Sequence, residues 1–468
     1  MYDKVPRNFW LIFLKNLFKE LKQLLKIGLP IYGSQISYMG MGVTDTIVAG
    51  RASALDLSGL AIGNALSMPF YFLLGGCLFA VTPIVAQLFG AKKYEEIGQK
   101  VREILWVSLA LGLIGFILYR NLSFFIPFFD IEDNIAQISD GYLKAMSYGF
   151  IANMIFTCLR CYSEGMGLTL PVFWVAFIGM VLNVPLDIIF VYGYFGVPPM
   201  GGVGCGIATS INVVIGVIVL LLVIVKKKEY EPTKIFSKFS LPNWSTTIEA
   251  LKLGLPIGFG VFVELSMFSG AALILGSLGA TVISGHTVAI NIVSVLFILP
   301  LSFGLAAATR IGNLVGEKKL HQAKYASNIA ILICFAGAIF NMVIILVFRE
   351  SLVSLYSSDL AVATIAMNLL FFGAIFQIPD GMQMGALGSL RGYKDTFAPM
   401  LMIILTYWFV ALPVGYHLTY FGIFGDSLGP SGIWIGMITG LTIFAGLIIP
   451  RLNYVSNKFI AKSNPELL

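Results

Sequence analysis

Four carboxylate side chains stand inside stretches of this chain that are otherwise strongly apolar. They belong to Asp45, Asp187, Glu264 and Asp380. An ionisable side chain within a membrane-spanning stretch is costly and therefore a functional candidate by default. No Lys or Arg is expected at the same depths, so these carboxylates need protons, metal cations or cationic ligands as partners. That chemistry is typical of a cation-coupled carrier.

The N-terminal half offers the more complete set of cation ligands. Asp45 and Asp187 are both predicted toward the outer ends of their spans, and Asn183 precedes Asp187 by one helical turn. Oxygen ligands of this kind suit hard cations such as Na⁺, and two neighbouring carboxylates can share a proton. We predict a coupling site formed by Asp45, Asn183, Asp187 and Thr209. The alternative is ordinary Asn and Thr packing around one protonated Asp.

The other two acids, Glu264 and Asp380, are predicted nearer mid-depth in the C-terminal half. Pro379 precedes Asp380 directly and can free a backbone carbonyl as a further ligand. We predict that this pair binds a cation or the substrate. Apart from Na⁺ or H⁺ at these four acids we expect no metal and no cofactor. The alternative for the nearby Gln377, Gln383 and Asn291 is a purely structural role.

Composition identifies the elements that position these residues. The 468 residues are 58% hydrophobic and 12% charged, with a mean hydropathy of +0.88, whereas soluble chains carry about 25% charged residues. Apolar runs near the length of a membrane span recur along the chain, which predicts an all-α polytopic membrane protein. The connections leave no room for a soluble catalytic domain, and no HExxH or Walker motif occurs, so we expect no enzyme. The net charge of +6 is assigned to loops and does not indicate nucleic-acid binding.

Apolar runs between charged or Gly/Pro breaks predict twelve spans. They are 24–50, 60–89, 104–123, 142–164, 170–193, 203–226, 250–277, 283–315, 325–348, 361–390, 396–419 and 431–452. With a cytoplasmic N-terminus, only four of the 30 basic residues fall outside: Arg51, Arg120, Lys144 and Arg349. Positive charge favours the inside, so both termini are predicted to be cytoplasmic.

The chain also repeats itself. Lys26–Pro30 recurs as Lys252–Pro256, and Ala86–Lys93 recurs as Gly312–Lys319, both 226 residues later. Duplication of a six-span unit predicts two six-helix lobes, 1–225 and 250–468, joined by a cytoplasmic linker over 226–249. Six is even, so the lobes are related by a pseudo-two-fold axis along the membrane normal, which favours a transporter that works by alternating access.

Three motifs make the chain resemble MATE (multidrug and toxic compound extrusion) transporters of the NorM-like branch. They are Val43–Thr46, Gly201–Thr209 and Leu390–Asp395. The resemblance implies cation-driven export, with Asp45, Asn183, Asp187 and Thr209 as an N-lobe cation site and Glu264 with Asp380 as a C-lobe pair. NorM-like members are expected to carry Tyr four residues before the second acid, where this chain has Phe376.

The function predicted from the sequence is secondary-active multidrug efflux by antiport. Cationic or amphiphilic small molecules would leave in exchange for Na⁺ or H⁺, from a monomer in the bacterial inner membrane, in contact with membrane lipid and without nucleic acid. The alternative is an exporter or flippase of a lipid-linked or endogenous metabolite on related architecture. Such phosphate-bearing substrates would favour a basic cavity, whereas this chain offers acids.

Overall fold

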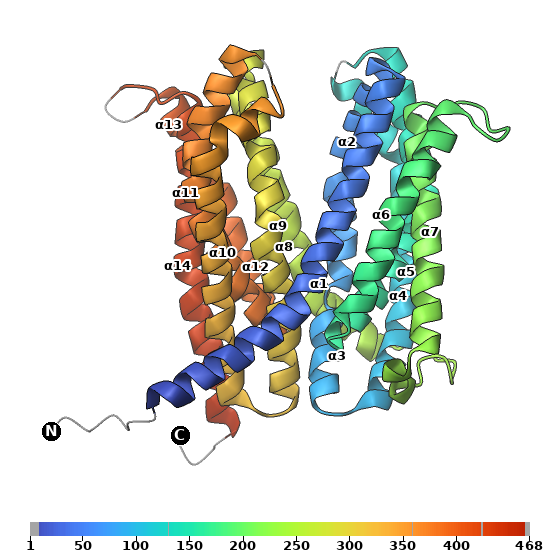
Figure 1. Cartoon of the computed structure of the whole chain (residues 1–468), viewed down its shortest axis with the longest axis vertical. Coiled ribbons are helices and arrows are strands. Elements are labelled where there is room, and N and C mark those ends of the chain that lie inside the picture. The colour runs from blue at the N-terminus through green and yellow to red at the C-terminus, as the bar shows by residue number, and fades with distance from the viewer. Residues whose placement is uncertain (1–8, 130, 358, 423–424, 464–468) are drawn as a thin grey trace. The chain divides into compact units, whose positions relative to one another are not determined.

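The computed structural model describes residues 9–129, 131–357, 359–422 and 425–463, and this part of the chain is helical without a β-strand. The first half contains α1 (Phe9–Ala52), α2 (Ala54–Leu78), α3 (Val81–Gly90), α4 (Tyr94–Asn121), η1 (Leu122–Phe129), α5 (Asp133–Gly165), α6 (Thr169–Tyr192), α7 (Gly202–Lys226) and η2 (Lys228–Thr233). The second half contains α8 (Trp244–Gly276), α9 (Ala280–Gly316), α10 (Leu320–Ser354), α11 (Leu360–Gly392), α12 (Phe397–Thr406), η3 (Tyr407–Ala411), α13 (Leu412–Tyr420) and α14 (Pro430–Ser463) (Figure 1).

The predicted all-helical membrane fold is confirmed, because each predicted span falls on a helix or on adjoining helices. Within the described residues, ten helical segments are long and apolar enough to cross a membrane. The segments at the other two predicted spans, α1 and α5, are helical as well. Polar side chains interrupt their apolar runs, so they fall outside this group of ten.

The duplication is visible in the backbone. Lys92 and Lys318, 226 residues apart in sequence, both adopt a left-handed conformation, with φ of 58° and 61°. Such values are uncommon for a residue other than glycine. The next residues close the turn in the same way, since the N–H groups of Lys93 and Lys319 each donate to a carbonyl five residues earlier, at 2.9 Å. The two halves therefore share their turn geometry as well as their sequence motifs.

The chain divides into two compact units, which we call the N unit (residues 33–266) and the C unit (residues 1–32 and 267–468). The C unit includes the start of α1, the first helix of the N-terminal half. The N unit includes the start of α8, the first helix of the C-terminal half. In the C unit, a Cβ added at Gly28 of α1 would lie 2.6 Å from the ring of Phe303 in α9. In the N unit, a Cβ added at Gly254 of α8 would lie 1.9 Å from the carbonyl oxygen of Cys77 in α2. Gly254 lies 226 positions after Gly28, and Cys77 lies 226 positions before Phe303, so the repeat reproduces this contact. The predicted lobe boundaries stay a prediction.

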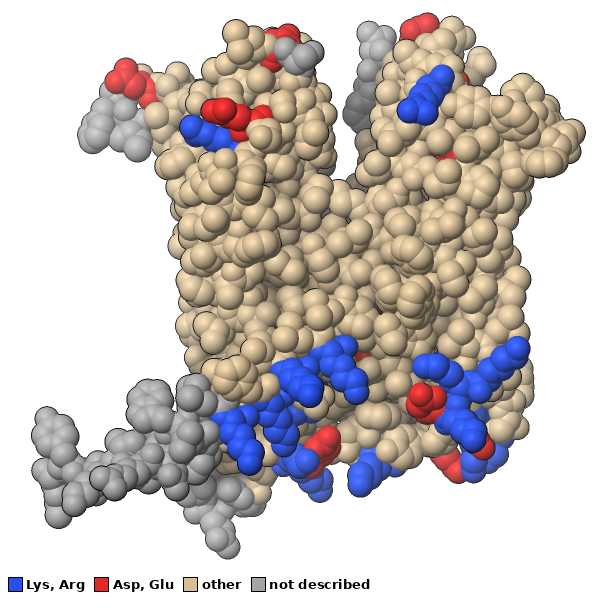
Figure 2. Space-filling model, viewed as in Figure 1, with Lys and Arg blue, Asp and Glu red and all other residues tan. Residues whose placement is uncertain are grey.

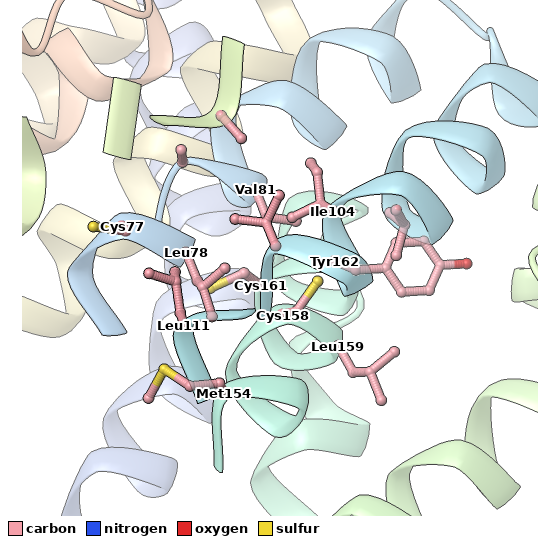
Figure 3. Packing of buried hydrophobic residues seen from close by; sticks show 14 of the residues in the cluster. Cys77, Leu78, Val81, Ile104, Leu111, Met154, Cys158, Leu159, Cys161 and Tyr162 are labelled. Atoms are coloured by element: carbon pink, nitrogen blue, oxygen red, sulfur yellow. The ribbon is translucent and has the colours of Figure 1, made fainter. Parts of the chain in front are cut away.

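The core of the N unit is a buried apolar cluster contributed mainly by α2 to α5 (Figure 3). Cys158 and Cys161 lie inside this cluster beside Leu159 and Tyr162, and both are free, buried thiols. Their positions favour small packing residues over a metal or redox pair.

The linker packs against the cytoplasmic end predicted for the N unit. The Arg102 guanidinium of α4 donates to the Lys234 carbonyl at 2.9 Å, and the Trp106 indole N–H donates to the Ser240 carbonyl at 2.9 Å. Tyr230 of η2 is buried and donates to the Ser163 hydroxyl at 3.1 Å. Burial also raises the pKa of Tyr230 to about 12.

Lys and Arg side chains gather at one end of each unit on the face seen in Figure 2. Between the two ends that face is almost entirely uncharged. A central uncharged band is what a bilayer requires, because apolar side chains must face the hydrocarbon there.

Close helix packing in the C unit depends on glycine at the contact between α9 and α11. A Cβ added at Gly388 would lie 1.9 Å from the carbonyl oxygen of Gly304. Small residues allow membrane helices to approach closely enough for van der Waals contact.

We expect Gly388→Ala to lower the stability of the C unit by about 1–3 kcal/mol, because the added methyl group forces α9 and α11 apart. The measurement is the melting temperature of the purified protein in detergent. Gly446→Ala in α14 is the matched control, since an added Cβ there meets no atom within 4 Å. Equal melting temperatures for the two variants would contradict the close-packing account.

Candidate functional site

Asn183 joins the two outer carboxylates of the N unit. Its side-chain Nδ2 donates to Asp45 Oδ1 at 2.7 Å and to Asp187 Oδ2 at 2.7 Å. Asn183 and Asp187 are fully buried, and Asp45 is 7% exposed. One amide group therefore uses both of its N–H bonds on two buried carboxylates that belong to different helices, α1 and α6.

Two residues of α7 complete the cluster. Thr209 Oγ1 donates to Asp45 Oδ2 at 3.3 Å. The Asn212 amide donates to Asn183 Oδ1 at 3.3 Å and to the Gly179 carbonyl at 3.0 Å. The structure thus brings together the four residues expected from the sequence, and their role in cation coupling stays a prediction.

Sequence reasoning missed Asn212. The available signal was its spacing, because it follows Thr209 by three residues in α7 and so lies on nearly the same helical face. Its contact with Asn183 depends on how α6 and α7 are rotated against each other. Hydropathy carries no information on that rotation.

Two buried oxygen atoms of the cluster receive no hydrogen bond from a protein donor. They are Asp187 Oδ1 and Asn212 Oδ1. The Asp45 and Asp187 carboxylates lie close enough to share a proton. Within the described residues, neither Asp45 nor Asp187 forms an ion pair with Lys or Arg. Buried polar atoms are normally satisfied, and carboxylate, amide and hydroxyl oxygens are ligands suited to Na⁺. The set fits a small cation, and the carboxylates alternatively fit a proton.

A second polar chain lies in the C unit around Asp380 of α11. The Gln383 amide donates to Asp380 Oδ1 at 2.7 Å, and the Tyr407 hydroxyl donates to Gln383 Oε1 at 2.8 Å. All three residues are buried. One turn earlier on α11, Gln377 accepts from the Asn341 amide at 3.1 Å. The sequence singled out both glutamines as possible structural residues, and the structure links Gln383 directly to the acid.

Glu264 lies in α8 and is half-buried, within the part of that helix that belongs to the N unit. Asp380 belongs to the C unit, so the pairing of the two acids stays a prediction. At the position where tyrosine is expected, Phe376 packs its buried ring 6.2 Å from the Phe268 ring and 6.1 Å from the Trp434 ring. Its surroundings are aromatic, and it supplies no hydroxyl.

A buried ion pair of the N unit was also not expected. Arg160 Nε of α5 lies 3.8 Å from Glu164 Oε1, and the side chains are 15% and 7% exposed. The guanidinium also lies over the Tyr38 ring, 5.6 Å from its centroid. The sequence signal was the spacing of four residues, but hydropathy does not single out this pair because both residues stand at the end of a predicted span.

We expect Asn183→Leu to destabilise the N unit, because it leaves two buried carboxylates without their shared donor. An unsatisfied buried polar group costs about 1–3 kcal/mol, and more when it is charged. The melting temperature in detergent should fall clearly below that of wild type. The control is Asn134→Leu, at an exposed amide near the start of α5. A melting temperature for Asn183→Leu equal to that of the control would show that the shared amide does not hold the cluster together.

A family model of known proteins matches the chain twice, once in each half. The MatE family model matches residues 30–189 and again residues 256–417. The chain is 37% identical over 445 residues to the probable multidrug resistance protein NorM of Acinetobacter baylyi, covering 95% of this chain and 98% of that protein. It is 36% identical over 442 residues to the multidrug resistance protein PmpM of Pseudomonas aeruginosa, covering 94% and 93%.

Solved structures share the fold at lower identity. An outward-facing multidrug resistance MATE family transporter of the MOP superfamily matches with a TM-score of 0.86 at 18% identity, covering 94% of this chain and 96% of that one. The eukaryotic MATE transporter AtDTX14 matches with a TM-score of 0.83 at 21% identity, covering 95% and 99%. At these identities the likeness concerns the fold.

Proposed function

The chain belongs to the MatE family of MATE transporters, and from this membership we propose that it exports amphiphilic and cationic organic compounds in exchange for Na⁺ or H⁺. It is a multi-pass membrane protein, and it resembles relatives named as multidrug resistance proteins along almost its whole length. We propose that the protein is a transporter and that export of its substrates requires no enzymatic step.

The observation that carries the proposal is the cluster of Asp45, Asn183, Asp187 and Thr209. Two carboxylates lie buried with an amide between them and no basic partner within the described residues. Burying unpaired charge is costly, so the cluster gains stability when a cation or proton joins it. An exchangeable positive partner at this point is what couples transport to an ion gradient.

The coupling follows from competition. A ligand shifts a conformational equilibrium only by binding one state more tightly than another. If the coupling cation and the cationic substrate favour different states, binding of one promotes release of the other, and this effect is reciprocal. Exchange therefore requires only that the carboxylates cannot bind the coupling cation and the cationic substrate tightly at the same time.

We propose that Glu264, in the N unit, and Asp380, in the C unit, each bind a cation or the substrate. The charged and polar residues of the Asp45 and Asp380 clusters are acids, amides and hydroxyls, which supports cationic substrates over phosphorylated ones. The alternative, export of a lipid-linked or endogenous metabolite, has no comparable support.

We propose that the protein lies in the bacterial plasma membrane as a monomer with both termini in the cytoplasm. The support for this orientation is the distribution of basic residues, because Lys and Arg favour the cytoplasmic side. Only Arg51, Arg120, Lys144 and Arg349 fall on the opposite side.

Asp45→Asn and Asp187→Asn should each lower ion-driven efflux by about 10- to 100-fold, the loss expected when a charge-assisted contact worth about 1.5–3 kcal/mol disappears. The measurement uses the full chain in proteoliposomes and follows ethidium, a fluorescent cationic amphiphile. One arm imposes a Na⁺ gradient at equal pH, and the other imposes a pH gradient without Na⁺. The arm that drives wild-type efflux identifies the coupling ion.

The control for the acid variants is Asp140→Asn. Asp140 forms a partly exposed ion pair with Lys144 at 2.6 Å, and such pairs contribute little to stability, so this variant should transport as wild type does. Glu264→Gln tests the proposed role of Glu264 in the same assay. Gradient-driven efflux retained in both Asp45→Asn and Glu264→Gln would refute the assigned ion roles.

The orientation is tested with reporter fusions. A green fluorescent protein fused after residue 468 should fluoresce, because that domain folds in the cytoplasm. Alkaline phosphatase fused after residue 131, in the predicted outer loop, should be active, whereas the same enzyme fused after residue 240 should be inactive. The reverse pattern would invert the proposed topology.

A further inference from the structure

The hydrogen bonds around Asp380 run in one direction. The Tyr407 hydroxyl donates to the Gln383 oxygen at 2.8 Å, and the Gln383 nitrogen donates to Asp380 Oδ1 at 2.7 Å. An amide group has one acceptor end and one donor end. Because the hydroxyl engages the acceptor end, the donor end is turned toward the carboxylate.

The backbone around Tyr407 is unusual. Residues Tyr407–Ala411 form a π-helical turn between α12 and α13, and the Leu412 N–H donates to the Tyr407 carbonyl five residues earlier. Pro413 follows one residue later and has no N–H to donate, so it favours a break in the regular α-helical pattern. Single π-helical turns are rare and occur frequently at functional sites.

Packing leaves the Tyr407 side chain little freedom. Its ring meets the Phe444 ring of α14 edge-on, with centroids 5.8 Å apart. Gly440 of α14 approaches the π-helical turn so closely that an added Cβ would lie 2.6 Å from the Ala411 Cβ. Tyr407 itself is 1% exposed. The hydroxyl is therefore presented to Gln383 from a rigid support.

We infer that Tyr407 is a positioning residue for Asp380, acting through the amide of Gln383. Without the hydroxyl, the Gln383 oxygen loses its donor, and the amide keeps only its bond to Asp380, so its orientation is held less firmly. With the hydroxyl in place, Gln383 holds Asp380 Oδ1 in one orientation. This inference rests on the proposed function, in which Asp380 binds a cation, either the coupling ion or the cationic substrate.

The inference predicts an effect on binding that a merely structural role would not produce. Tyr407→Phe keeps the ring and removes only the hydroxyl. Loss of one hydrogen bond, worth about 0.5–1.5 kcal/mol, corresponds to an approximately 3- to 10-fold change in an equilibrium constant. The half-saturating concentration of the coupling ion or of ethidium should rise by that factor in the proteoliposome assay. The maximal rate should stay within about twofold of wild type.

Gln383→Met should reproduce the shift, because methionine has similar length and cannot form either bond. Tyr393→Phe is the matched control: Tyr393 is another buried tyrosine of the C unit, and its ring packs against the Phe459 ring, with centroids 5.2 Å apart. That variant should keep wild-type half-saturating concentrations. Gln377→Met is a second control, because the Gln377 amide bonds to Asn341 and to the Val293 carbonyl.

Combining Tyr407→Phe with Asp380→Asn shows whether the tyrosine acts through the acid. Binding is read by fluorescence titration with ethidium and by the rise in melting temperature with Na⁺, so the test does not need transport. Tyr407→Phe should weaken binding in the wild-type background and leave it unchanged in the Asp380→Asn background. An equal weakening in both backgrounds would overturn the inference.

Other outcomes are equally decisive. Half-saturating concentrations for Tyr407→Phe equal to those of Tyr393→Phe would refute the inference, as would a lower melting temperature and rate with unchanged binding. If wild-type protein shows no ion-driven ethidium efflux, the proposed function fails and the inference fails with it. If wild type transports and Tyr407→Phe binds normally, only the inference fails.

Discussion

Burial of unpaired acids among apolar helices is the constraint on which the site geometry depends. A carboxylate removed from water must find donors or an opposite charge, and in the N unit the donors are the Asn183 amide and the Thr209 hydroxyl. Asn183 reaches both Asp45 and Asp187 at 2.7 Å, which fixes the distance between α1 and α6 near the acids. The buried Asp187 Oδ1, which receives no hydrogen bond from a protein donor, supports the proposal that the cluster binds a cation or a proton.

Duplication produced two similar backbones and then different chemistry. At the offset of 228 residues that relates Pro185 to Pro413, Asn183 corresponds to Ala411 and Asp187 to Gly415. The repeat thus kept the helices and turns while the acids arose at unrelated positions. In the N unit an amide lies between two carboxylates, whereas in the C unit an amide lies between a carboxylate and a phenol. The two clusters therefore surround their acids with different donors.

The first helix of each half serves both compact units. The start of α1 packs in the C unit and its end, with Asp45, in the N unit; the start of α8, with Glu264, packs in the N unit and its end in the C unit. A continuous helix that belongs to two units is a covalent link between them. Two of the four membrane acids, Asp45 and Glu264, therefore lie on the helices that run through both units.

The sequence by itself determined the helical membrane fold, the duplication and the candidate acids, because hydropathy, periodicity and charge are properties of the local chain. It also placed Asn183 one turn from Asp187, since spacing along a helix is local too. The tertiary structure alone decided that Asn212 joins this cluster, that Tyr407 reaches Asp380 through Gln383, and that each unit contains the start of the other half's first helix. These contacts depend on how each helix is rotated, on which helices lie beside it and on one π-helical turn. Side-chain packing across the unit sets all three, and no local sequence pattern encodes that packing.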